Sequence, residues 1–188
     1  MIVGMCGRIG AGKETLTSFL REKGFVYFET SALLKEELAK RSLEITRWNM
    51  QNLADSMREK GGAGAVMKLL LDKASKDKTK NYIFDSLRNA GEAEFLKNNA
   101  KDFILIGVDA PQKMRFERMM KRAKPSDPKT WEEFLKVDER DNFDTTNPYG
   151  QQTGRLLEVS DFVIVNKGSL KDSLKEIEKI WGKISFKC

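Results

Sequence analysis

Short apolar runs bounded by glycine, proline or charged residues alternate along the chain with longer segments whose apolar residues recur every three or four positions. The short runs predict β-strands at residues 2–6, 25–28, 82–84, 103–108 and 162–165. The longer segments predict helices at residues 14–23, 33–41, 48–60, 65–75, 90–98, 111–122, 130–140 and 170–181, with Pro111 in a first turn. Strands that alternate with helices pair in parallel, so we expect a three-layer α/β fold with a five-stranded parallel sheet.

Two regions interrupt this alternation. Several predicted helices stand between the second and third strands, and a polar segment separates the helix after the fourth strand from the last strand. A chain of 188 residues has the size of one domain. We therefore expect a single domain over residues 1–188, with helical insertions at about residues 30–64 and 123–154.

The composition is that of a folded globular protein, with 40% hydrophobic and 33% charged residues. A net charge of +6 favours a partner that carries phosphates, although charge alone cannot distinguish a nucleotide from a nucleic acid. The N-terminal MIVGMCGRIG lacks the basic start of a signal peptide, and no apolar run reaches membrane-spanning length. We expect a cytoplasmic protein with no membrane partner.

The absence of histidine and the small number of cysteines limit the reactions that the protein can catalyse. The chain has no histidine, which excludes serine triads, imidazole acid–base catalysis and zinc sites built on imidazole. Its only cysteines, Cys6 and Cys188, are too few for a disulfide framework or a thiolate metal site. This usage indicates a reducing compartment.

A glycine-rich segment directly after the first predicted strand matches the G-x-x-x-x-G-K part of the Walker A signature. Glycines allow backbone N–H groups to turn toward a phosphate, the following helix adds its positive N-terminal dipole, and the lysine bridges the transferring phosphates. A turn of this kind without function is the alternative. We expect ATP phosphates to bind to Gly7, Arg8, Ile9, Gly10, Ala11, Gly12, Lys13, Glu14 and Thr15.

The position after the lysine departs from the signature, because Glu14 stands where serine or threonine normally coordinates magnesium, and Thr15 follows. A carboxylate is a hard oxygen ligand and could hold Mg²⁺ directly or through water. Alternatively, Glu14 faces solvent at a helix N-terminus, where negative charge is favourable. Both alternatives stay open at this point.

A second acidic position follows the third predicted strand, where YIFD ends in Asp85 and Arg88 comes three residues later. Ligands of open α/β sheets gather at the carboxyl ends of strands, so both side chains should lie near the glycine-rich loop. Asp85 is then a candidate magnesium ligand and Arg88 a candidate phosphate ligand. The structural alternatives are a helix N-cap for Asp85 and a surface position for Arg88.

Basic residues recur at three- and four-residue spacing on the helix predicted at residues 111–122. This spacing places Arg115, Arg118, Lys121 and Arg122 on one basic stripe. Such a stripe is usually solvated, but here the helix leads toward the second insertion, where cations are needed for a charged transition state. Arg118 and Arg122 are therefore candidates, and Arg140, whose flanking acids can pair with it, is a weaker one.

Together these segments resemble the nucleoside monophosphate kinase superfamily. Within it they are most similar to an archaeal P-loop family labelled dephospho-coenzyme A kinase-like or adenylate kinase-related, and to the P-loop domain that precedes some deoxycytidylate deaminases. The similarity runs through nearly the whole chain. Its most specific segments are GRIGAGKET, YIFDSLRNAGE, DFILIGVDAPQKMRFERMMKR, DPKTWEEFLKVDERDN, NPYGQQ and SDFVIVNKGSL.

The resemblance implies roles for further residues. Thr30, Lys35, Arg58 and Arg88 would bind the acceptor nucleotide, although lysine at position 35 lacks the bidentate geometry of the arginine found in related kinases. Arg118 and Arg122 fall where such kinases carry an R-x-x-x-R pair at the start of a lid. The loop with Asn166, Gly168 and Ser169 would contact adenine, unless it is an ordinary strand-to-helix turn.

The sequence thus predicts a kinase that transfers a phosphoryl group from ATP to a nucleotide-like acceptor, with Mg²⁺ as cofactor. The catalytic residues would be Lys13, Asp85, Arg88, Arg118 and Arg122, and the metal ligands Thr15, Glu14 and Asp85. The insertions would bind the acceptor and close as a lid. The acceptor stays open among deoxynucleotides, ribonucleotides and dephospho-coenzyme A, and the chain is either a monomer or a homodimer.

Two other functions compete with this prediction. A nucleotide sensor without turnover fits the departure at Glu14 and the deaminase-linked segment NPYGQQ, although this chain lacks the zinc-binding signatures of a deaminase. A nucleic-acid-associated ATPase or end kinase fits the basic charge. It ranks last, because no platform of interleaved aromatic and basic residues is visible.

Overall fold

The computed structural model describes residues 1–123, 127–143 and 147–185. Cys188 and two short parts of the expected insertion at residues 123–154 therefore lie outside the described residues. No helix in the described part of the chain is long and apolar enough to cross a membrane.

Five strands form one parallel sheet in the order β2-β3-β1-β4-β5. The prediction of a three-layer α/β fold with a five-stranded parallel sheet is confirmed, and each strand matches its predicted range to within one residue. The strands could be located in the sequence because strands of a parallel sheet are buried on both faces and therefore consist of continuous runs of valine, isoleucine and phenylalanine. The strands are β1 (Ile2–Gly7), β2 (Val26–Glu29), β3 (Tyr82–Asp85), β4 (Phe103–Asp109) and β5 (Phe162–Val165).

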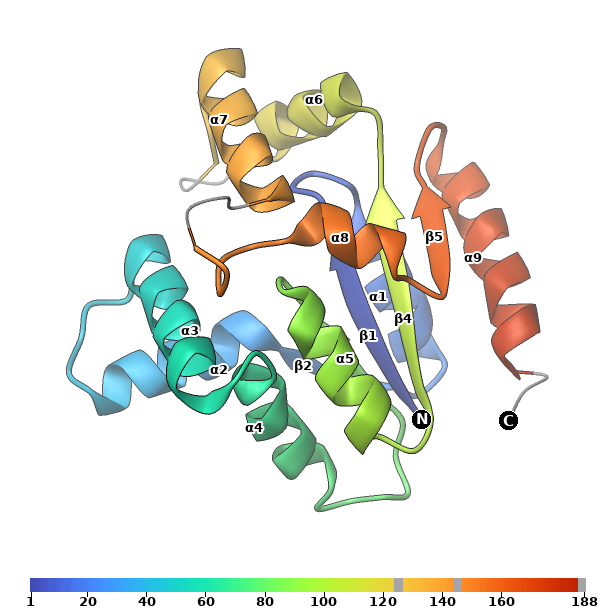
Figure 1. The fold of residues 1–188 in the computed structure, drawn as a ribbon. Coiled ribbons are helices and arrows are strands. Elements are labelled where there is room, and N and C mark those ends of the chain that lie inside the picture. The colour runs from blue at the N-terminus through green and yellow to red at the C-terminus, as the bar shows by residue number, and fades with distance from the viewer. Residues whose placement is uncertain (124–126, 144–146, 186–188) are drawn as a thin grey trace.

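Helices cover both faces of the sheet (Figure 1). On one face, α1 (Lys13–Glu22) packs against α9 (Leu170–Ser185), and on the other α5 (Ala90–Asn99) packs beside α8 (Thr153–Glu158). Between β2 and β3 come α2 (Thr30–Lys40), α3 (Arg47–Gly61) and α4 (Ala65–Ala74); after β4 come α6 (Gln112–Arg122) and α7 (Trp131–Asn142). Of these helices, α2 and α3 lie within the insertion predicted at residues 30–64 and α7 lies within that at residues 123–154, whereas α4 and α6 lie just outside these ranges.

Two local predictions need correction. The six-residue helix α8 was not predicted, because it is too short to show a helical period, yet it packs directly on β1 and β4. Gly107 of β4 permits this contact, since a Cβ atom there would lie 2.7 Å from the Leu157 side chain. Pro111 does not belong to the first turn of α6 but forms its N-cap, and the helix begins at Gln112.

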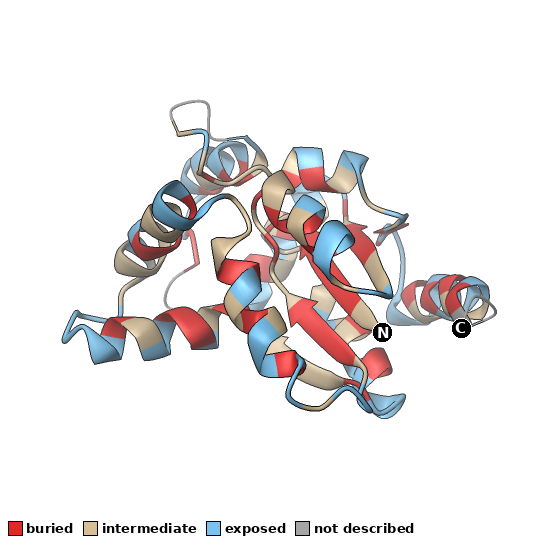
Figure 2. Ribbon diagram, turned by 60° about the horizontal axis from the view of Figure 1, so that its bottom comes forward, coloured by how far each residue is buried: buried red, intermediate tan, exposed pale blue. Residues whose placement is uncertain are grey.

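The apolar core lies on both sides of the central strands, which Figure 2 shows as buried beneath partly exposed helices. Val3 and Met5 pack toward α1 and α9, whereas Cys6 packs toward the opposite face. The central strand β1 lies between β3 and β4, so the strand order changes direction at β1. Ligands of such sheets bind in the crevice at the carboxyl ends of the strands.

Candidate active site

The glycine-rich loop that joins β1 to α1 has a backbone that only glycine adopts easily. Gly10 and Gly12 have φ angles of 76° and 91°, in the left-handed region. A Cβ atom on Gly10 would also lie 2.6 Å from the carbonyl oxygen of Arg115, which no backbone contact tolerates. The motif glycines therefore allow the tight turn and the close approach of α6.

Side chains of Arg115, Arg118 and Asn166 donate hydrogen bonds to carbonyl groups of the glycine-rich loop. Arg118 Nη1 and Asn166 Nδ2 donate to the carbonyl oxygen of Ala11 at 3.3 and 2.8 Å. Arg115 Nη1 donates to that of Ile9 at 3.2 Å. Carbonyl oxygens repel phosphate, so their engagement by these donors suits a phosphate-binding loop.

Lys13, at the start of α1, has an unusual acidity. Burial of its ammonium group, and to a smaller extent the nearby charge of Arg88, lowers the pKa of Lys13 to about 8. The Asp85 carboxylate opposes this shift. Lys13 Nζ also donates to the carbonyl oxygen of Gly7 at 3.4 Å. A buried ammonium group of this kind is stabilised when a polyanion arrives.

We expect the affinity for a nucleoside triphosphate to fall as the pH rises above about 8, by up to about tenfold per pH unit. The charged form of Lys13 binds phosphate, and it predominates below a pKa of about 8. Titrations of the nucleotide from pH 7 to pH 9.5 measure the effect. A Lys13→Met variant should show a flatter profile, and equal pH dependence in both proteins would contradict the assignment.

Asp85, at the end of β3, is held in place by neighbours on β2 and α2. Tyr27 donates its hydroxyl hydrogen to Oδ2 of Asp85 at 2.7 Å, and Thr30 Oγ1 donates to the Asp85 carbonyl oxygen at 2.6 Å. Burial, the Asp85 hydrogen bond and the Asp85 charge all raise the pKa of Tyr27, which keeps it a donor. Oδ1 of Asp85 is buried and has no hydrogen-bond partner among the described residues.

That orphaned carboxylate oxygen fits a bound cation, because a buried oxygen without a partner is costly unless a ligand satisfies it. The described residues contain no cluster of three or more His, Cys, Asp or Glu side chains that could hold a metal by themselves. Mg²⁺ commonly binds through one or two carboxylates together with water and substrate phosphates. Asp85 is suited to such a site, while Glu14 is exposed and Thr15 half-buried on the same cavity wall.

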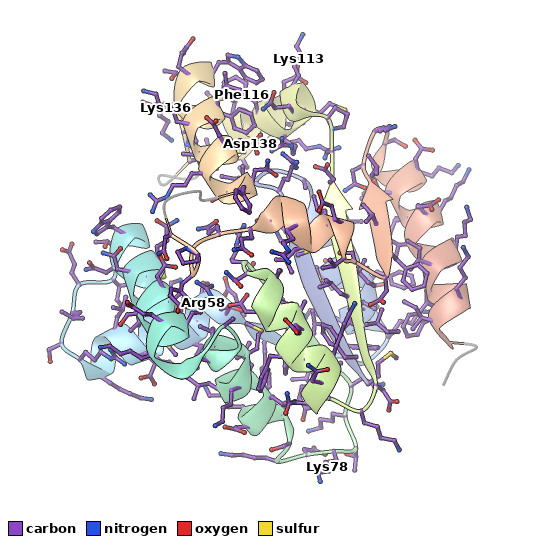
Figure 3. The ribbon with its side chains drawn as sticks, viewed as in Figure 1. Arg58, Lys78, Lys113, Phe116, Lys136 and Asp138 are labelled. Carbon is purple, nitrogen blue, oxygen red and sulfur yellow. The ribbon has the colours of Figure 1, made fainter. Side chains whose placement is uncertain are left out.

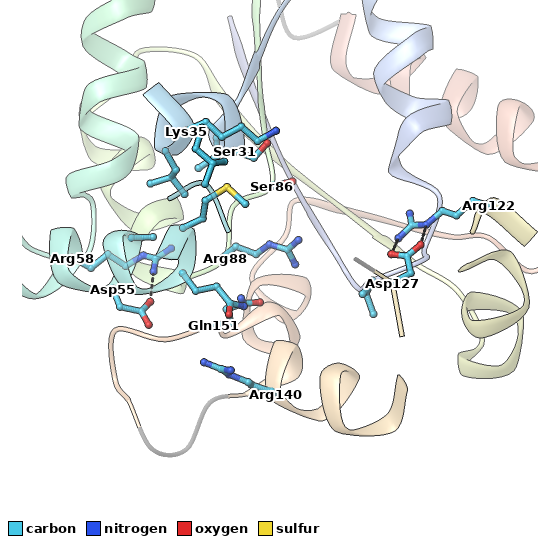
Figure 4. A pocket seen from close by; sticks show the side chains of 17 residues that line it. Ser31, Lys35, Asp55, Arg58, Ser86, Arg88, Arg122, Asp127, Arg140 and Gln151 are labelled. Carbon is cyan, nitrogen blue, oxygen red and sulfur yellow. Dashed lines mark hydrogen bonds and ion pairs between the residues drawn. The ribbon is translucent and has the colours of Figure 1, made fainter. Parts of the chain in front are cut away.

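Two cavities meet at this edge of the sheet. The larger, of about 960 Å³, contains the glycine-rich loop, Lys13, Asp85 and Asn166; we call it the donor cavity, after the ATP phosphates that the sequence predicts there. The smaller, of about 490 Å³, lies between α2, α3 and residues 147–152 (Figure 4); we call it the acceptor cavity, after the predicted acceptor residues that line it. Their shared wall consists of Ile9, Ser86, Arg88 and Arg122.

The three candidate arginines differ in what they contact. Arg122 donates two hydrogen bonds to Asp127, at 2.7 and 2.8 Å, and Arg118 donates to the carbonyl groups of Ala11 and Asn166. Arg88 Nη1 lies 3.8 Å from Asp141 and makes no hydrogen bond within the described part of the chain. The Arg88 side chain lines both cavities. Unlike the other two arginines, whose side chains donate hydrogen bonds, it is held by none at Nη1 among the described residues.

The predicted basic stripe on α6 is wrong in one respect, because Arg115 is only 2% exposed and does not lie on a solvated face. It forms a bidentate ion pair with Asp138 of α7, with Nη2 at 2.7 Å from Oδ2, and donates from Nε to the carbonyl oxygen of Ala110. Phe134 packs beneath the guanidinium group. Figure 3 shows Asp138 on the side of α7 that faces α6, near Phe116. The pair fastens α7 to the loop.

The predicted acceptor residues all line the acceptor cavity, in different surroundings. Lys35 is exposed, whereas Thr30 is buried and occupied with the Asp85 carbonyl group. Arg58 is buried, and its guanidinium group donates to Glu92, to Asp55 and to the carbonyl oxygen of Tyr149. A direct contact of Arg58 with an acceptor phosphate stays a prediction, and it would require these hydrogen bonds to change.

The loop after β5 lies beside the glycine-rich loop, to which Asn166 donates a hydrogen bond, and its predicted contact with adenine stays a prediction. Asn166 is 5% exposed and its Oδ1 has no hydrogen-bond partner among the residues described here. Ser169 donates from both its backbone N–H and its hydroxyl group to Asp172, and Gly168 lies against the same carboxylate. The turn is therefore stabilised internally while Asn166 borders the donor cavity.

The sequence did not indicate several residues of the site. Tyr27 became a candidate only through the register that places β2 beside β3, with Glu29 opposite Asp85. Asp138 lies 23 positions after its partner Arg115 on another helix. Gln151 lines the acceptor cavity. It belongs to the segment NPYGQQ, which resembles a segment of other proteins, but that resemblance assigned no role to any of its residues.

Comparison with known proteins places the chain in a family. A profile described as an AAA domain matches residues 3–142. A UPF0200 protein of Aeropyrum pernix is 34% identical over 173 residues, covering 92% of this chain and 87% of that protein. A UPF0200 protein of Hyperthermus butylicus is 28% identical over 185 residues, covering 98% and 95%.

Solved structures share the fold. The TT1252 protein of Thermus thermophilus superposes with a TM-score of 0.59 at 21% identity, covering 97% of both chains. Shikimate kinase of Acinetobacter baumannii gives 0.54 at 18% identity, covering 97% and 93%, and deoxyadenosine kinase of M. mycoides gives 0.53 at 19%, covering 98% and 99%. The resemblance to the P-loop nucleoside monophosphate kinase superfamily is confirmed. The chain therefore contains an AAA domain of the P-loop kind and belongs to the UPF0200 proteins.

Proposed function

We propose that this protein transfers the terminal phosphoryl group of ATP to a nucleotide-like acceptor, with Mg²⁺ as cofactor. The observation that carries the proposal is the junction of the donor and acceptor cavities at Arg88 and Arg122. Phosphoryl transfer requires two substrates in line with a cation between them, and two cavities with a shared cationic wall provide that arrangement. The fold shared with shikimate and deoxyadenosine kinases supports it.

Each part of the donor cavity then has a role. The loop amides and Lys13 bind the donor phosphates, and the turn at Asn166, Gly168 and Ser169 borders the adenine. Asp85, together with Thr15 or Glu14, holds Mg²⁺, which neutralises charge on the phosphates when bound. Tyr27 keeps Asp85 oriented by its hydrogen bond to Oδ2.

The transferring group lies at the shared wall. Arg88 stabilises its negative charge, because its side chain lines both cavities. Arg122 contributes once its contact with Asp127 is exchanged, and Arg118 keeps the loop in its binding shape by donating to Ala11. No covalent intermediate and no histidine are required.

The two insertions exclude water by closing over the substrates. A contact between them exists beside the acceptor cavity, where Arg140 of α7 lies over the ring of Trp48 of α3, 5.6 Å from its centre. Trp48 lines a neighbouring cavity that shares Gln51 and Arg140 with the acceptor cavity. The residues 30–64 then form the acceptor-binding part and residues 123–154 the lid of a single domain.

An Asp85→Asn variant should need about tenfold or more Mg²⁺ for half-maximal activity, because an amide oxygen binds a hard dication less strongly than a carboxylate oxygen does. An amide has a single oxygen, so if that oxygen accepts the Tyr27 hydrogen bond, the NH₂ group takes the place of Oδ1 and weakens cation binding further. Magnesium titrations at saturating ATP measure the effect. A Glu14→Ser variant titrated in parallel decides whether Glu14 is a ligand, and an unchanged magnesium requirement in Asp85→Asn would contradict the assignment of Asp85.

The proposal is tested by ADP release from ATP in the presence and absence of nucleoside monophosphates and dephospho-coenzyme A. We expect ADP release that depends on one class of acceptor. Tight nucleotide binding without acceptor-dependent ADP release would favour a sensor instead. Stimulation by DNA or RNA, with affinity that falls steeply with salt, would favour a nucleic-acid-associated enzyme.

A further inference from the structure

A short segment between the lid and α8, residues 147–152, is fastened to the acceptor side of the molecule and is called the strap. Asn89 Nδ2 donates to the carbonyl oxygens of Gly150 at 3.0 Å and Pro148 at 3.3 Å. Arg58 Nη1 donates to that of Tyr149 at 3.0 Å. The backbone of the strap is therefore held at three successive residues.

Arg58 is itself rigidly positioned. It is 3% exposed, and Nε and Nη2 contact the completely buried Glu92 at 3.0 and 2.9 Å. Asp55 accepts from Arg58 Nη1 at 3.0 Å and, through its other oxygen, from Asn147 Nδ2 of the strap at 3.2 Å. This network connects α3, the start of α5 and the strap, so it fixes what the strap presents to the cavity.

The strap presents Gln151 to the acceptor cavity, and Figure 4 draws its side chain between those of Arg88 and Arg140. Gln151 Oε1 is buried and accepts no hydrogen bond from the described residues. A buried carbonyl oxygen without a donor is unfavourable, and a ligand that supplies a donor removes this penalty. This amide therefore marks a place where a bound molecule makes a hydrogen bond.

The rest of the cavity indicates the shape of that molecule. Leu34, Met50 and Ala54 provide apolar walls, and Gln51 of α3 adds a second amide. Arg88 stands at the end shared with the donor cavity. A planar, largely apolar group with hydrogen-bonding edges, joined to a phosphate that reaches Arg88, matches this distribution. A nucleoside monophosphate has these features, whereas a polyol or sugar acid has no planar apolar part.

We infer that Gln151 determines the specificity for the acceptor by hydrogen bonding to the base of a nucleoside monophosphate. The inference rests on the proposed function, because it assigns the acceptor cavity to the nucleotide that receives the phosphoryl group. An amide satisfies an adjacent donor and acceptor on a base in either of its two orientations. Arg58 acts through the strap and is a positioning residue.

The test is the binding of AMP, CMP, GMP and UMP, without ATP, measured by titration calorimetry. For the monophosphate that wild type binds best, Gln151→Leu should raise the Kd about 10- to 100-fold, because the site then loses the hydrogen bond that selects the base. Gln152→Leu is the matched control. That neighbouring side chain donates an exposed hydrogen bond to the Pro148 carbonyl oxygen and does not line the acceptor cavity as the described residues form it, so its loss should leave the Kd within about twofold.

A second variant changes the chemistry without changing the size. Gln151→Glu replaces an amide by a carboxylate, which only accepts hydrogen bonds at neutral pH. Guanine offers two adjacent donors, so the preference for GMP over AMP should increase by about tenfold or more. Unchanged ATP affinity and an unchanged melting temperature show that each variant is folded.

Several results would overturn the inference: no monophosphate binds wild type, Gln151→Leu binds as tightly as wild type, or Gln152→Leu weakens binding equally. Equal weakening of inorganic phosphate and monophosphate by Gln151→Leu would also do so, because the base would then not be involved. These outcomes are separate from the proposed function. If the protein binds one nucleoside monophosphate selectively but transfers no phosphoryl group, Gln151 still determines the choice of base, and the proposed kinase activity is refuted.

Discussion

An Asp138→Ala variant should have a free energy of unfolding about 3–5 kcal/mol lower than that of wild type, because it leaves a buried charge without its partner. Arg115 and Asp138 are both 2% exposed, and the other carboxylate recorded near the guanidinium group, that of Asp109, lies 3.9 Å from Nε, beyond hydrogen-bond distance. Arg115 also holds the Ile9 carbonyl group, so the damage should reach the phosphate-binding loop. Chemical denaturation of both proteins measures the difference.

The control removes both charges. A double variant, Arg115→Met with Asp138→Leu, fills the site with apolar groups and should regain most of the lost stability. The pH dependence gives a second check. Burial alone would raise the pKa of Asp138, but hydrogen bonds from Arg115 and Gln112 prevail and lower it. The stabilisation is thus present above about pH 4 and lost at lower pH. A single variant as stable as wild type at neutral pH would contradict this account.

A Lys13→Ala variant should lose phosphoryl transfer by a factor on the order of 10² to 10³ in kcat, because a preorganised cation at the donor phosphates disappears. Its fold should persist, since burial of the Lys13 ammonium group lowers the pKa and so opposes stability. Initial rates at saturating ATP measure the loss. Lys113→Ala, which removes an exposed charge on α6, is the control and should retain the wild-type rate.

The sheet and most helices could be predicted because their signals are local. Buried parallel strands show continuous apolar runs, and capped helices show a regular period, as in α5 and α7 with their capping boxes. The loop between β1 and α1 was equally clear, because its glycines and lysine are fixed in spacing. The short α8 has too few residues for a period and could not be seen in this way.

The rest of the site depends on contacts between distant parts of the chain. Spacing placed Arg115 on the same face as Arg118, but only the packing of α7 against α6 shows that Arg115 is buried with Asp138. The environment of Arg58 likewise depends on Glu92 and the strap. A basic residue on a helix looks the same in sequence whether it contacts solvent, a ligand or a buried carboxylate.

The central claim, transfer of the terminal phosphoryl group to an acceptor, is tested most directly with ATP labelled at the γ-phosphate. Wild-type protein is incubated with Mg²⁺ and each nucleoside monophosphate, and the products are separated. We predict that the label appears in the diphosphate of the preferred acceptor and is lost from it in Lys13→Ala. Label found only in inorganic phosphate, or transfer by Lys13→Ala at the wild-type rate, would contradict the assignment.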